Sequence, residues 1–537
     1  MLGSMQDVPL SLTHVFERAE RLWPHKEIVT ATVGGGRERT TYGAWAERTR
    51  RLAGVFDDLG ISSDGRVGTF AWNSARHLEL YFAAPCSGRV LHTLNIRLFP
   101  EQLTYVANHA EDEVVFVDRS LMPLFWPRID ELTTVKYVVV MDDGADAEIP
   151  DDPRIRDYEE LLAAASPVAD LAIEDENQAA AMCYTSGTTG NPKGVVYSHR
   201  SMVLHAMATM LADTFGLCER DVVLPVVPQF HANAWGLAHA VAMTGATIIM
   251  PGPDLSPKAI ATLIEEEHVT LAAGVPTIWM GMLPELDGRD VSSLRQILCG
   301  GSAVPRALSE AYREKTGKPI LQAWGMTETS PLGSIANVTS ALEDGSEDEL
   351  AALRASVGQI SPLVDARHVE AGTTEPLPWD GEAQGELQVR GAWIAAGYYD
   401  DERPCNTPDG WLMTGDVVTI DEHGYIRIVD RTKDVIKSGG EWISSVELEN
   451  EIMAHPDVAE AAVIGLADQK WGERPVACVV AADGKELTAE DVRTFLDGRV
   501  AKFWIPERVE LIDEVPKTSV GKFSKKDLRE RFAAAEA

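Results

Sequence analysis

A short apolar run that leads straight into a loop rich in glycine and hydroxyl groups sets the strongest limit on the fold of this chain. The segment covers residues 180–194, A-A-M-C-Y-T-S-G-T-T-G-N-P-K-G, and its apolar part, 180–184, has the length of a buried β-strand. Glycines let backbone N–H groups turn toward one point, hydroxyl groups add donors, and Lys193 supplies a positive charge. A polar surface loop is the plainer alternative, but this combination directly after a strand favours a site for phosphate oxygens.

The loop is not a Walker A motif. That motif ends in Gly-Lys-Ser/Thr, whereas here Pro192 precedes Lys193 and Gly194 follows it. The candidate phosphate-binding residues are those of the loop itself. They are Thr185, Ser186, Gly187, Thr188, Thr189, Gly190 and Lys193.

Length, charge and cysteine use narrow the class of protein. A chain of 537 residues is too long for one hydrophobic core, so we expect at least two domains. The formal net charge of −35 argues against nucleic acid as a partner, because a phosphate backbone demands a basic face. Six cysteines without a C-x-x-C spacing are typical of reduced thiols. With no secretory signal, peroxisomal tripeptide or membrane span in the sequence, we expect a cytoplasmic protein.

Strand and helix patterns alternate through most of the chain, which is typical of an α/β fold. Strand-like runs occur at 67–71, 113–118, 136–141, 221–228, 246–250, 269–274 and 294–298. Loops with special residues follow several of them, among them His231 and the segment Gly301-Ser302-Ala303. Because ligands bind outside the carboxyl ends of strands in open α/β sheets, we expect one crevice lined by these loops.

A second candidate site segment covers residues 321–329, L-Q-A-W-G-M-T-E-T. Glu328 follows an apolar approach and is the kind of hard oxygen ligand that Mg²⁺ prefers beside nucleotide phosphates. The alternative is a solvated carboxylate on a loop. The acidic tract that follows, 341–349, is interpreted as an exposed insertion without a site.

The last part of the chain changes character. Ser444 and Glu447 form a capping-box pattern at the start of a helix, and the residues after Arg431 read as a small α+β domain. Lys522 lies near its end in a basic stretch that reverses the acidic bias of the chain; a solvated tail lysine is the alternative reading. Alternating or short apolar runs predict strands at 386–390, 424–429, 461–464 and 476–480.

Five segments in order resemble the motifs of the adenylate-forming superfamily, which includes acyl-CoA synthetases, firefly luciferases and the adenylation domains of peptide synthetases. Trp324 stands where tyrosine is common in that superfamily, which keeps an aromatic face and removes a hydroxyl. The resemblance covers nearly the whole chain. The five segments are 184–194, 321–329, 411–416, 430–434 and 516–526.

The resemblance implies a fold and a set of roles. It implies a large N-terminal adenylation domain of several subdomains over residues 1–431, with ATP and acyl sites, and a small mobile α+β C-terminal domain over residues 432–537. It implies Mg²⁺ at Thr185 and Glu328, with Lys522, His231 and Glu328 as catalytic residues. The residues that it assigns to ATP or AMP are Thr185, Ser186, Gly187, Thr188, Thr189, Gly190 and Lys193 for phosphates, Gly301, Ser302, Ala303, Trp324, Gly325, Met326 and Thr327 for adenine, and Asp416 and Arg431 for ribose.

The chemistry agrees with these roles. Attack of a carboxylate on the α-phosphorus of ATP brings anions together, so Mg²⁺ and lysines must neutralise the developing charge. Lys522 suits a mobile element, because it is needed only before a CoA thiolate displaces AMP. The resemblance places the pivot at Lys433. It places the CoA-facing loop at Lys437, Gly439, Gly440, Glu441 and Trp442.

One sequence position, 231, narrows the class of acid that the enzyme would use. Amino-acid-activating domains have an aspartate after the phenylalanine that corresponds to Phe230, whereas this chain has His231, so no carboxylate awaits an α-amine. An acyl pocket is expected at His231, Trp235, Gly301 and Trp324, although Trp235 also suits simple core packing. The chain looks like bacterial medium-chain acyl-CoA ligases and 3-methylmercaptopropionate-CoA ligases. We expect a short, linear, apolar acid such as 3-methylmercaptopropionate or butyrate.

Two other functions remain as alternatives. A luciferase-like oxygenase would need O₂ rather than CoA for product formation. A nucleotide-binding scaffold without turnover would have no use for Lys522, Glu328 and Asp416. No carrier domain follows residue 537, which favours a free thiol as the acceptor. A homodimer is expected from the resemblance alone.

Overall fold

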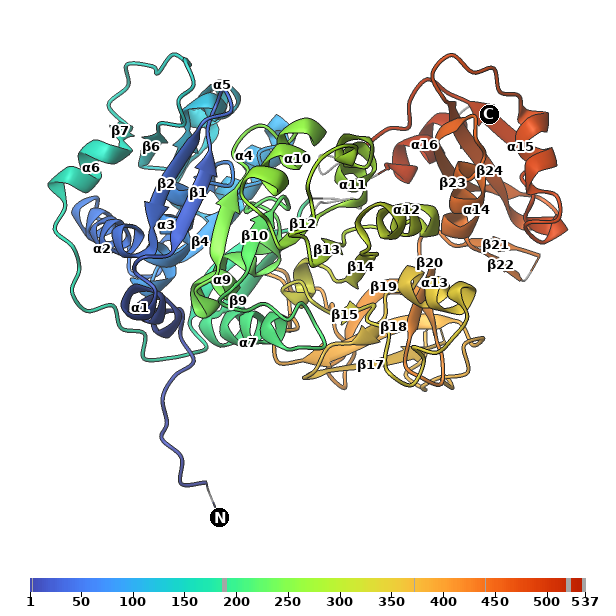
Figure 1. Cartoon of the computed structure of the whole chain (residues 1–537), viewed down its shortest axis with the longest axis horizontal. Coiled ribbons are helices and arrows are strands. Elements are labelled where there is room, and N and C mark those ends of the chain that lie inside the picture. The colour runs from blue at the N-terminus through green and yellow to red at the C-terminus, as the bar shows by residue number, and fades with distance from the viewer. Residues whose placement is uncertain (2, 186–190, 371, 440, 518–522, 534–537) are drawn as a thin grey trace. The chain divides into compact units, whose positions relative to one another are not determined.

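The computed structural model describes residues 1, 3–185, 191–370, 372–439, 441–517 and 523–533. The chain divides into two compact units. The first comprises Met1–Thr185, Asn191–Val364 and Arg390–Cys405, and the second comprises the described parts of Asp365–Val389 and Asn406–Ala537. Figure 1 shows the elements along the chain.

A seven-stranded sheet in the first unit has the order β7-β6-β5-β3-β4-β8-β9. Neighbouring strands are parallel except for β8 and β9, which pair antiparallel. Parallel neighbours need crossover connections, and the predicted alternation of strands and helices supplies them. The strands are β3 (Arg66–Phe70), β4 (Val90–Thr93), β5 (Asp112–Asp118), β6 (Tyr137–Met141), β7 (Ile155–Asp157), β8 (Ala179–Tyr184) and β9 (Gly194–Ser198).

A second sheet in the same unit has nine strands in the order β16-β15-β14-β13-β12-β10-β11-β1-β2. Its central strands are parallel, and antiparallel strands close both edges. The predicted α/β fold is confirmed. The strands are β1 (Glu27–Ala31), β2 (Arg37–Thr41), β10 (Val222–Pro225), β11 (Thr247–Met250), β12 (Leu271–Gly274), β13 (Gln296–Cys299), β14 (Ile320–Trp324), β15 (Ser334–Ile335) and β16 (Gln359–Ile360).

Hydroxyl side chains cap several helices of the first unit. The side-chain oxygens of Thr41, Ser74, Ser198 and Ser256 each accept a hydrogen bond from the backbone N–H three residues later. The α-helices are α1 (Leu12–Leu22), α2 (Tyr42–Asp58), α3 (Ala75–Cys86), α4 (Pro100–Ala110), α5 (Met122–Phe125), α6 (Tyr158–Ala164), α7 (His199–Met210), α8 (Ala232–Trp235), α9 (Leu237–Thr244), α10 (Pro257–Glu266), α11 (Pro276–Met282), α12 (Arg306–Thr316) and α13 (Glu347–Ala355). The 3-10 turns are η1 (Arg119–Leu121), η2 (Trp126–Glu131), η3 (Pro284–Leu286) and η4 (Thr327–Thr329).

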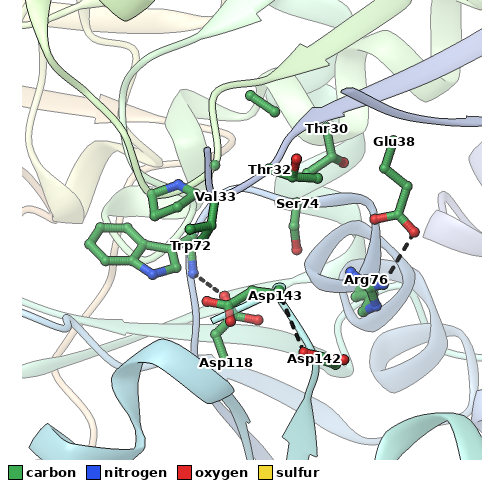
Figure 2. Close-up of a pocket in the computed structure, with 14 residues that line it drawn as sticks. Thr30, Thr32, Val33, Glu38, Trp72, Ser74, Arg76, Asp118, Asp142 and Asp143 are labelled. Carbon is green, nitrogen blue, oxygen red and sulfur yellow. Dashed lines mark hydrogen bonds and ion pairs between the residues drawn. The ribbon is translucent and has the colours of Figure 1, made fainter. Parts of the chain in front are cut away.

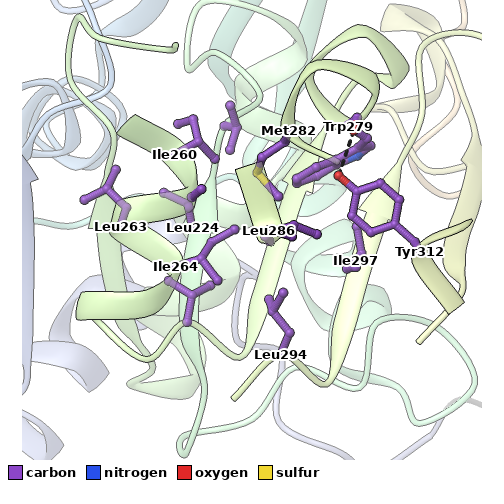
Figure 3. Close-up of a cluster of buried hydrophobic side chains, with 14 of the residues drawn as sticks. Leu224, Ile260, Leu263, Ile264, Trp279, Met282, Leu286, Leu294, Ile297 and Tyr312 are labelled. Atoms are coloured by element: carbon purple, nitrogen blue, oxygen red, sulfur yellow. Dashed lines mark hydrogen bonds between the residues drawn. The ribbon is translucent and has the colours of Figure 1, made fainter. Parts of the chain in front are cut away.

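One hydrophobic cluster fills the space between the nine-stranded sheet and helices α10, α11 and α12 (Figure 3). Leu224 and Ile297 contribute from the strands. Trp279 of α11 is fully buried, and its indole N–H donates to Leu298 O at 3.1 Å. The hydroxyl of Tyr312 on α12 donates to Trp279 O at 2.7 Å, so the polar atoms of both rings are satisfied inside the core.

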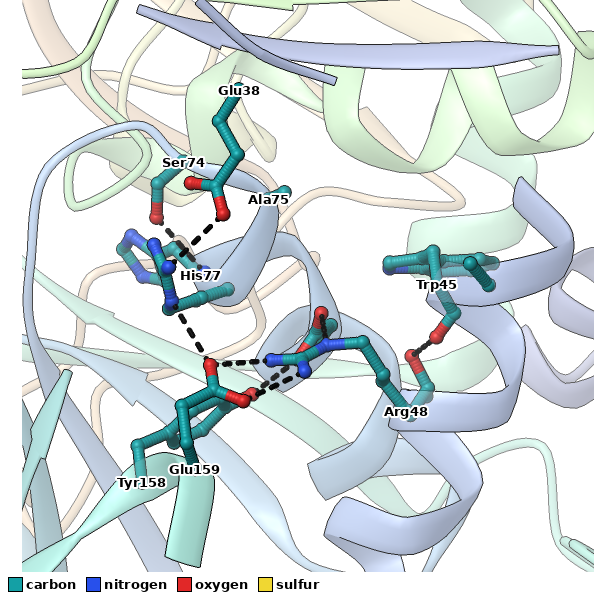
Figure 4. A network of polar contacts seen from close by, with 12 residues as sticks. Glu38, Trp45, Arg48, Ser74, Ala75, His77, Tyr158 and Glu159 are labelled. Carbon is teal, nitrogen blue, oxygen red and sulfur yellow. Dashed lines mark hydrogen bonds and ion pairs between the residues drawn. The ribbon is translucent and has the colours of Figure 1, made fainter. Parts of the chain in front are cut away.

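A partly buried polar network joins α2, α3 and α6 (Figure 4). Arg48 of α2 donates to the buried Glu79 of α3 at 2.6 Å and to Glu159 of α6 at 2.8 Å. The hydroxyl of Tyr158 also donates to Glu79. Burial raises the pKa of the Glu79 carboxyl, and the Arg48 guanidinium opposes that shift. The network therefore depends on Arg48 to keep a carboxylate inside the protein.

The second unit contains antiparallel strands, as the alternating runs predict. A four-stranded sheet has the order β17-β18-β19-β20, and a second sheet has the order β22-β21-β24-β23, with β25 paired to β24. The strands are β17 (Val364–Val369), β18 (Gly385–Gly391), β19 (Leu412–Ile420), β20 (Ile426–Arg431), β21 (Ile436–Ser438), β22 (Glu441–Ile443), β23 (Val458–Asp468), β24 (Gly472–Ala481) and β25 (Arg508–Leu511). The helices are α14 (Ser445–Met453), α15 (Ala489–Leu496), α16 (Lys525–Ala533) and the 3-10 turn η5 (Lys502–Trp504).

All six cysteines are free thiols, and five of them are buried. In the described part of the chain, no helix has both the length and the apolar character that crossing a membrane requires.

Candidate functional site

The predicted phosphate loop connects two antiparallel strands. The expected strand at 180–184 is β8, and the chain returns along β9. The described residues at the two ends of the loop bond to each other. Thr185 N–H donates to Lys193 O at 2.9 Å, and Lys193 N–H donates to Thr185 Oγ1 at 3.1 Å. The rest of the predicted loop lies outside the described residues, namely Ser186, Gly187, Thr188, Thr189 and Gly190.

Glu328 lies in the turn η4, which directly follows β14. Glu328 is only 5% exposed. Hydrogen bonds from two other segments of the chain hold the turn in place. Ala395 N–H donates to Glu328 O at 2.8 Å, and the Tyr398 hydroxyl donates to Glu328 Oε1 at 2.5 Å. From β9, the Tyr197 hydroxyl donates to Thr327 O at 2.8 Å. Glu328 is therefore a fixed, buried carboxylate and not a solvated loop residue.

Tyr398 also contacts the lysine of the phosphate loop. Lys193 Nζ lies 4.4 Å from the centroid of the Tyr398 ring, within the range of a cation–π interaction. Burial raises the pKa of the Tyr398 hydroxyl, and the adjacent Glu328 carboxylate raises it further, so the hydroxyl is a donor at neutral pH. The sequence analysis did not single out Tyr398. The available signal was a pair of tyrosines, Tyr398-Tyr399, after a segment rich in glycine and alanine.

Tyr399 fastens the same segment to β9. Its backbone N–H donates to Gly194 O at 2.8 Å, and its hydroxyl accepts from Arg66 at 2.6 Å. A Cβ atom on Gly194 would lie 3.1 Å from the ring of Tyr184 and 3.2 Å from Cβ of Tyr399. Glycine at this position therefore permits the close approach of the two segments.

The segment after His231 has an unusual backbone. Ala232, Asn233, Ala234 and Trp235 have φ angles of 42°, 51°, 51° and 55°, so four consecutive residues other than glycine are left-handed. This conformation costs roughly 1–2 kcal/mol per residue and persists only where surroundings enforce it. One such contact comes from β8, where the Cys183 thiol donates to Asn233 Oδ1 at 2.9 Å. The sequence analysis predicted a loop here but not this backbone.

Trp235, one of the predicted acyl residues, lies beside the predicted adenine segments. A Cβ atom on Gly300 would lie 3.3 Å from the Trp235 ring and 3.1 Å from Ala323 O. Trp235 therefore packs where β13 and β14 end, and it is 8% exposed. His231 is half-buried, and its backbone N–H donates to Pro228 O at 3.1 Å.

The adenine segments themselves differ in exposure. Gly301, Ser302 and Ala303 form an exposed loop between β13 and α12. Trp324, at the end of β14, is 6% exposed. A Cβ atom on Gly333 would lie 2.3 Å from the Trp324 ring, so one edge of the indole packs against that glycine. The roles assigned to these residues stay predictions.

The two predicted ribose residues form an ion pair within the second unit. Arg431 Nε lies 2.7 Å from Asp416 Oδ1. The two residues are partners in the antiparallel pair of β19 and β20. Arg431 also donates to Thr414 O at 3.4 Å. The strand register thus brings together two residues that the sequence analysis assigned to one role.

The predicted pivot and CoA-facing residues follow in the same unit. Lys433 is exposed, and Lys437 and Trp442 are partners across β21 and β22. Gly439 has a φ of +64° and donates its N–H to Trp471 O at 2.7 Å. Gly440, Lys522 and the side chain of Glu441 lie outside the described residues.

The helix after Lys522 is anchored to the end of β20. Lys525 Nζ lies 2.7 Å from Glu449 Oε1 and donates to Ser445 Oγ at 2.5 Å. The backbone N–H of Ser445 donates to Asp430 Oδ2 at 2.6 Å. Of the predicted capping box at Ser444, the structure shows that its hydroxyl oxygen accepts the N–H three residues later.

A pocket of about 370 Å³ lies elsewhere in the first unit (Figure 2). Its lining includes Trp72, Arg76, Asp118, Asp142 and Asp143. Burial raises the pKa of Asp118 to about 8, although the N–H of Trp72 donates to its carboxyl at 2.7 Å. None of the predicted site residues that the structure describes lines this pocket.

The residues present fit a magnesium ion that is bound largely through a nucleotide. Among the described residues, no group of three or more His, Cys, Asp and Glu side chains could hold a metal. Mg²⁺ typically keeps several waters and binds one or two carboxylates together with substrate phosphates. Glu328 offers one buried, oriented carboxylate of this kind.

Comparison with protein families gives two matches. Residues 16–399 match the AMP-binding enzyme family. Residues 447–522 match the C-terminal domain of AMP-binding enzymes.

The chain is also similar to individual proteins along its full length. It is 44% identical to 3-methylmercaptopropionyl-CoA ligase of Ruegeria lacuscaerulensis, covering 100% of this chain and 99% of the relative. It is 41% identical to medium-chain-fatty-acid–CoA ligase of Ectopseudomonas oleovorans, covering 99% and 98%. Its structure is similar to that of ATP-bound MatB from Rhodopseudomonas palustris, with a TM-score of 0.83, 27% identity, and 98% and 99% of the two chains covered.

Proposed function

The chain belongs to the family of AMP-binding enzymes and is an AMP-forming CoA ligase, and we propose that its substrate is a short, linear, apolar carboxylic acid. The first candidate is 3-methylmercaptopropionate, and the second is a medium-chain fatty acid. Support comes from full-length identities of 44% and 41% to ligases named for these two acids. A third relative, 46% identical, is named for long-chain fatty acids, so the assay below decides the chain length. His231, in place of an acidic residue, agrees with an acid that carries no ammonium group.

The first half-reaction joins the acid to AMP. An oxygen of the carboxylate bonds to the α-phosphorus of ATP, the bond from that phosphorus to the bridging oxygen breaks, and pyrophosphate leaves. Backbone N–H groups of the loop 185–190 and the Lys193 ammonium would bind the phosphates. Lys522 would neutralise charge that develops at the α-phosphate in the transition state. When bound at Glu328 and Thr185, Mg²⁺ supplies further charge neutralisation.

The second half-reaction transfers the acyl group to CoA. A thiolate attacks the acyl carbonyl, a tetrahedral oxyanion forms, and AMP leaves with the electron pair of the broken bond. The CoA-facing residues would be Lys437, Gly439, Gly440, Glu441 and Trp442. Because Lys522 is needed only before this step, we propose that the domain boundary lies after Arg431 and that Lys433 is the pivot.

The acyl group would be enclosed by His231, Trp235, Gly301 and Trp324. The buried indole of Trp235, packed where β13 and β14 end, offers an apolar wall. A linear chain without charge fits such a wall better than a dicarboxylate, because burial of a second carboxylate against an apolar ring costs free energy. His231 would contact the carboxyl end of the acid.

A CoA-dependent AMP-release assay over a panel of acids tests the proposal. The panel contains 3-methylmercaptopropionate, butyrate, hexanoate, octanoate, isobutyrate, benzoate and malonate. The expected result is the highest kcat/KM for 3-methylmercaptopropionate or butyrate, with little turnover of malonate and benzoate. A preference for octanoate would support the second candidate, whereas a preference for an aromatic or dicarboxylic acid would contradict both.

The same assay tests the alternative function, a luciferase-like oxygenase, which would need O₂ rather than CoA. Product formation under anaerobic conditions is expected to be unchanged. Omission of CoA is expected to abolish AMP release, while pyrophosphate is still released once per enzyme as the acyl-adenylate forms. We further propose a cytoplasmic protein, which agrees with six free thiols. A homodimer stays a prediction from the family resemblance, and sedimentation equilibrium measures it.

A further inference from the structure

Tyr398 contacts two oppositely charged side chains at once. Its hydroxyl donates to Glu328 Oε1 at 2.5 Å, and the Lys193 ammonium lies 4.4 Å from its ring centroid. The tyrosine thus holds each charged group through a contact that leaves its charge intact.

The backbone around Tyr398 is fastened to the same two places. Ala395 N–H donates to Glu328 O at 2.8 Å, and Tyr399 N–H donates to Gly194 O at 2.8 Å. Gly194 directly follows Lys193 in the chain. Backbone bonds on either side of Tyr398 therefore fix it against the two residues that its side chain contacts. A side chain held in this way is preorganised and cannot easily move away from either charge.

We propose that Tyr398 is a positioning residue for the bound nucleotide, orienting the Glu328 carboxylate for Mg²⁺ and the Lys193 ammonium for the phosphates. This inference rests on the proposed roles of Glu328 and Lys193. A hydroxyl that donates to one carboxylate oxygen fixes the plane of the group and leaves the second oxygen for the metal. A ring face attracts an ammonium group with little directionality, so Lys193 can shift onto a phosphate oxygen without losing an ion pair.

The metal half of the proposal is tested by Tyr398→Phe, which removes the hydroxyl and keeps the ring. Binding of Mn²⁺ in the presence of α,β-methylene-ATP is measured by electron paramagnetic resonance, which needs no turnover. Tyr398→Phe is expected to weaken Mn²⁺ binding about 10-fold, as loss of a partner of a metal-binding carboxylate typically does. Tyr399→Phe is the matched control, because it removes a hydroxyl bonded to Arg66 and should change Mn²⁺ affinity less than about 2-fold.

A double-mutant cycle separates positioning from a merely structural role. If Tyr398 acts through Glu328, adding Tyr398→Phe to Glu328→Gln changes Mn²⁺ affinity by less than about 2-fold. An effect of the same size in both backgrounds would overturn the proposal. If Glu328→Gln itself leaves Mn²⁺ affinity unchanged, the proposed metal role of Glu328 fails, and this outcome is distinct from a failure confined to Tyr398.

The proposed effect of Tyr398 on Lys193 is tested by Tyr398→Leu, which removes the aromatic ring as well as the hydroxyl. Binding of ATP in the presence of EDTA is measured by calorimetry, so the metal does not contribute. Tyr398→Leu is expected to bind ATP about 3- to 10-fold more weakly than Tyr398→Phe, because the Lys193 ammonium loses its ring contact. In a Lys193→Ala background the two variants should bind ATP equally. Equal binding by the two variants with Lys193 present would overturn this half.

Discussion

Arg431 Nε lies 2.7 Å from Asp416 Oδ1, because the two residues are partners across the antiparallel strands β19 and β20. Asp416 is 1% exposed, whereas the side chain of Arg431 is 43% exposed. A buried carboxylate that one guanidinium fixes within a strand ladder has a defined orientation. This geometry suits recognition of adjacent ribose hydroxyl groups.

Asp416→Asn is therefore expected to weaken ATP use selectively. A hydrogen bond to a charged group contributes about 1.5–3 kcal/mol, so the KM for ATP should rise by roughly 10- to 100-fold. Steady-state kinetics should show a KM for CoA changed by less than about 2-fold. The sharper comparison uses 2′-deoxy-ATP and 3′-deoxy-ATP. At least one analogue should be a poor substrate for the wild type yet equal to ATP for Asp416→Asn, and an unchanged preference for the ribose hydroxyls would contradict the assigned role.

Lys522→Ala is expected to remove only the first half-reaction. ATP–pyrophosphate exchange should fall by about 100-fold or more, since a cation that stabilises the transition state is lost. Binding of ATP should change by less than about 3-fold. Transfer from a chemically prepared acyl-adenylate to CoA should continue at a rate near that of the wild type.

A nearby lysine provides the control for this variant. Lys526→Ala removes a side chain that is 64% exposed and lies in the first turn of α16, four residues after Lys522 in the sequence. It should leave both half-reactions unchanged. Equal losses in ATP–pyrophosphate exchange and in acyl transfer from the prepared acyl-adenylate would show a folding defect in Lys522→Ala. Unchanged exchange would refute the catalytic assignment.

The sequence was a good guide where local pattern and motif coincide. The apolar run at 180–184 is β8, and the buried strands around it lie in parallel sheets, because such runs are compatible with burial on both faces. The acidic tract at 341–349 shows the limit of a compositional reading. The structure places a capping box at Ser346 and Glu349 there, which opens α13. The tract is largely exposed, as expected from its charge, but the charge pattern did not reveal the helix start within it.

The rest of the candidate site depends on tertiary contacts that no local pattern reports. Tyr398 reaches Glu328 across 70 residues, and Lys193 reaches Tyr398 across a still longer stretch of chain. The left-handed run that ends at Trp235 is likewise enforced by its neighbours, since Asn233 alone among its residues adopts that backbone readily. Asp416 and Arg431 could be predicted as a pair only through the family resemblance, and strand register explains it.

Gly325→Ala is expected to disrupt the turn that carries Glu328. A Cβ atom at Gly325 would lie 1.5 Å from Pro331 O, so the backbone of the turn must move. We expect a loss of stability of at least about 2 kcal/mol, as for other forced backbone shifts. Metal-dependent ATP binding should be lost as well. Gly397→Ala is the control near Tyr398, because a Cβ atom there meets no atom within 4 Å, and it should be nearly neutral in urea denaturation.

Arg48→Met should destabilise the first unit by leaving Glu79 buried without its cation. Removing one partner of a buried pair typically costs about 3–5 kcal/mol. The pKa of Glu79 is already raised by burial, and the variant removes the opposing guanidinium. Because the pKa of the Glu79 carboxyl is raised in the folded state, stability falls as pH rises above the pKa of this carboxyl in the unfolded chain. The deficit measured by urea denaturation should therefore be larger at pH 8 than at pH 5, and Arg48→Met/Glu79→Gln should recover part of it.

Buried histidines set the acid sensitivity of the first unit. Burial lowers the pKa of His77 and His199 to about 4 and that of His205 and His239 to about 3. An unfolded histidine has a pKa of about 6.5, so the unfolded chain binds more protons below that pH. Stability should therefore be fully present above about pH 6.5 and should fall as pH decreases toward 4.

His239→Phe should weaken the dependence of stability on pH, because it removes one of these four buried histidines. The His239 ring packs 5.4 Å from the ring of Phe82, and its Nε2 has no hydrogen-bond partner in the described structure, so an apolar ring suits the site. Between pH 6 and 4, the slope of unfolding free energy against pH should decrease by about 1.4 kcal/mol per pH unit, the value for one proton. His25→Gln, at an exposed position, controls for loss of an imidazole. Urea denaturation at half-unit pH intervals measures both slopes, and parallel curves for wild type and His239→Phe would show that His239 does not contribute to acid unfolding.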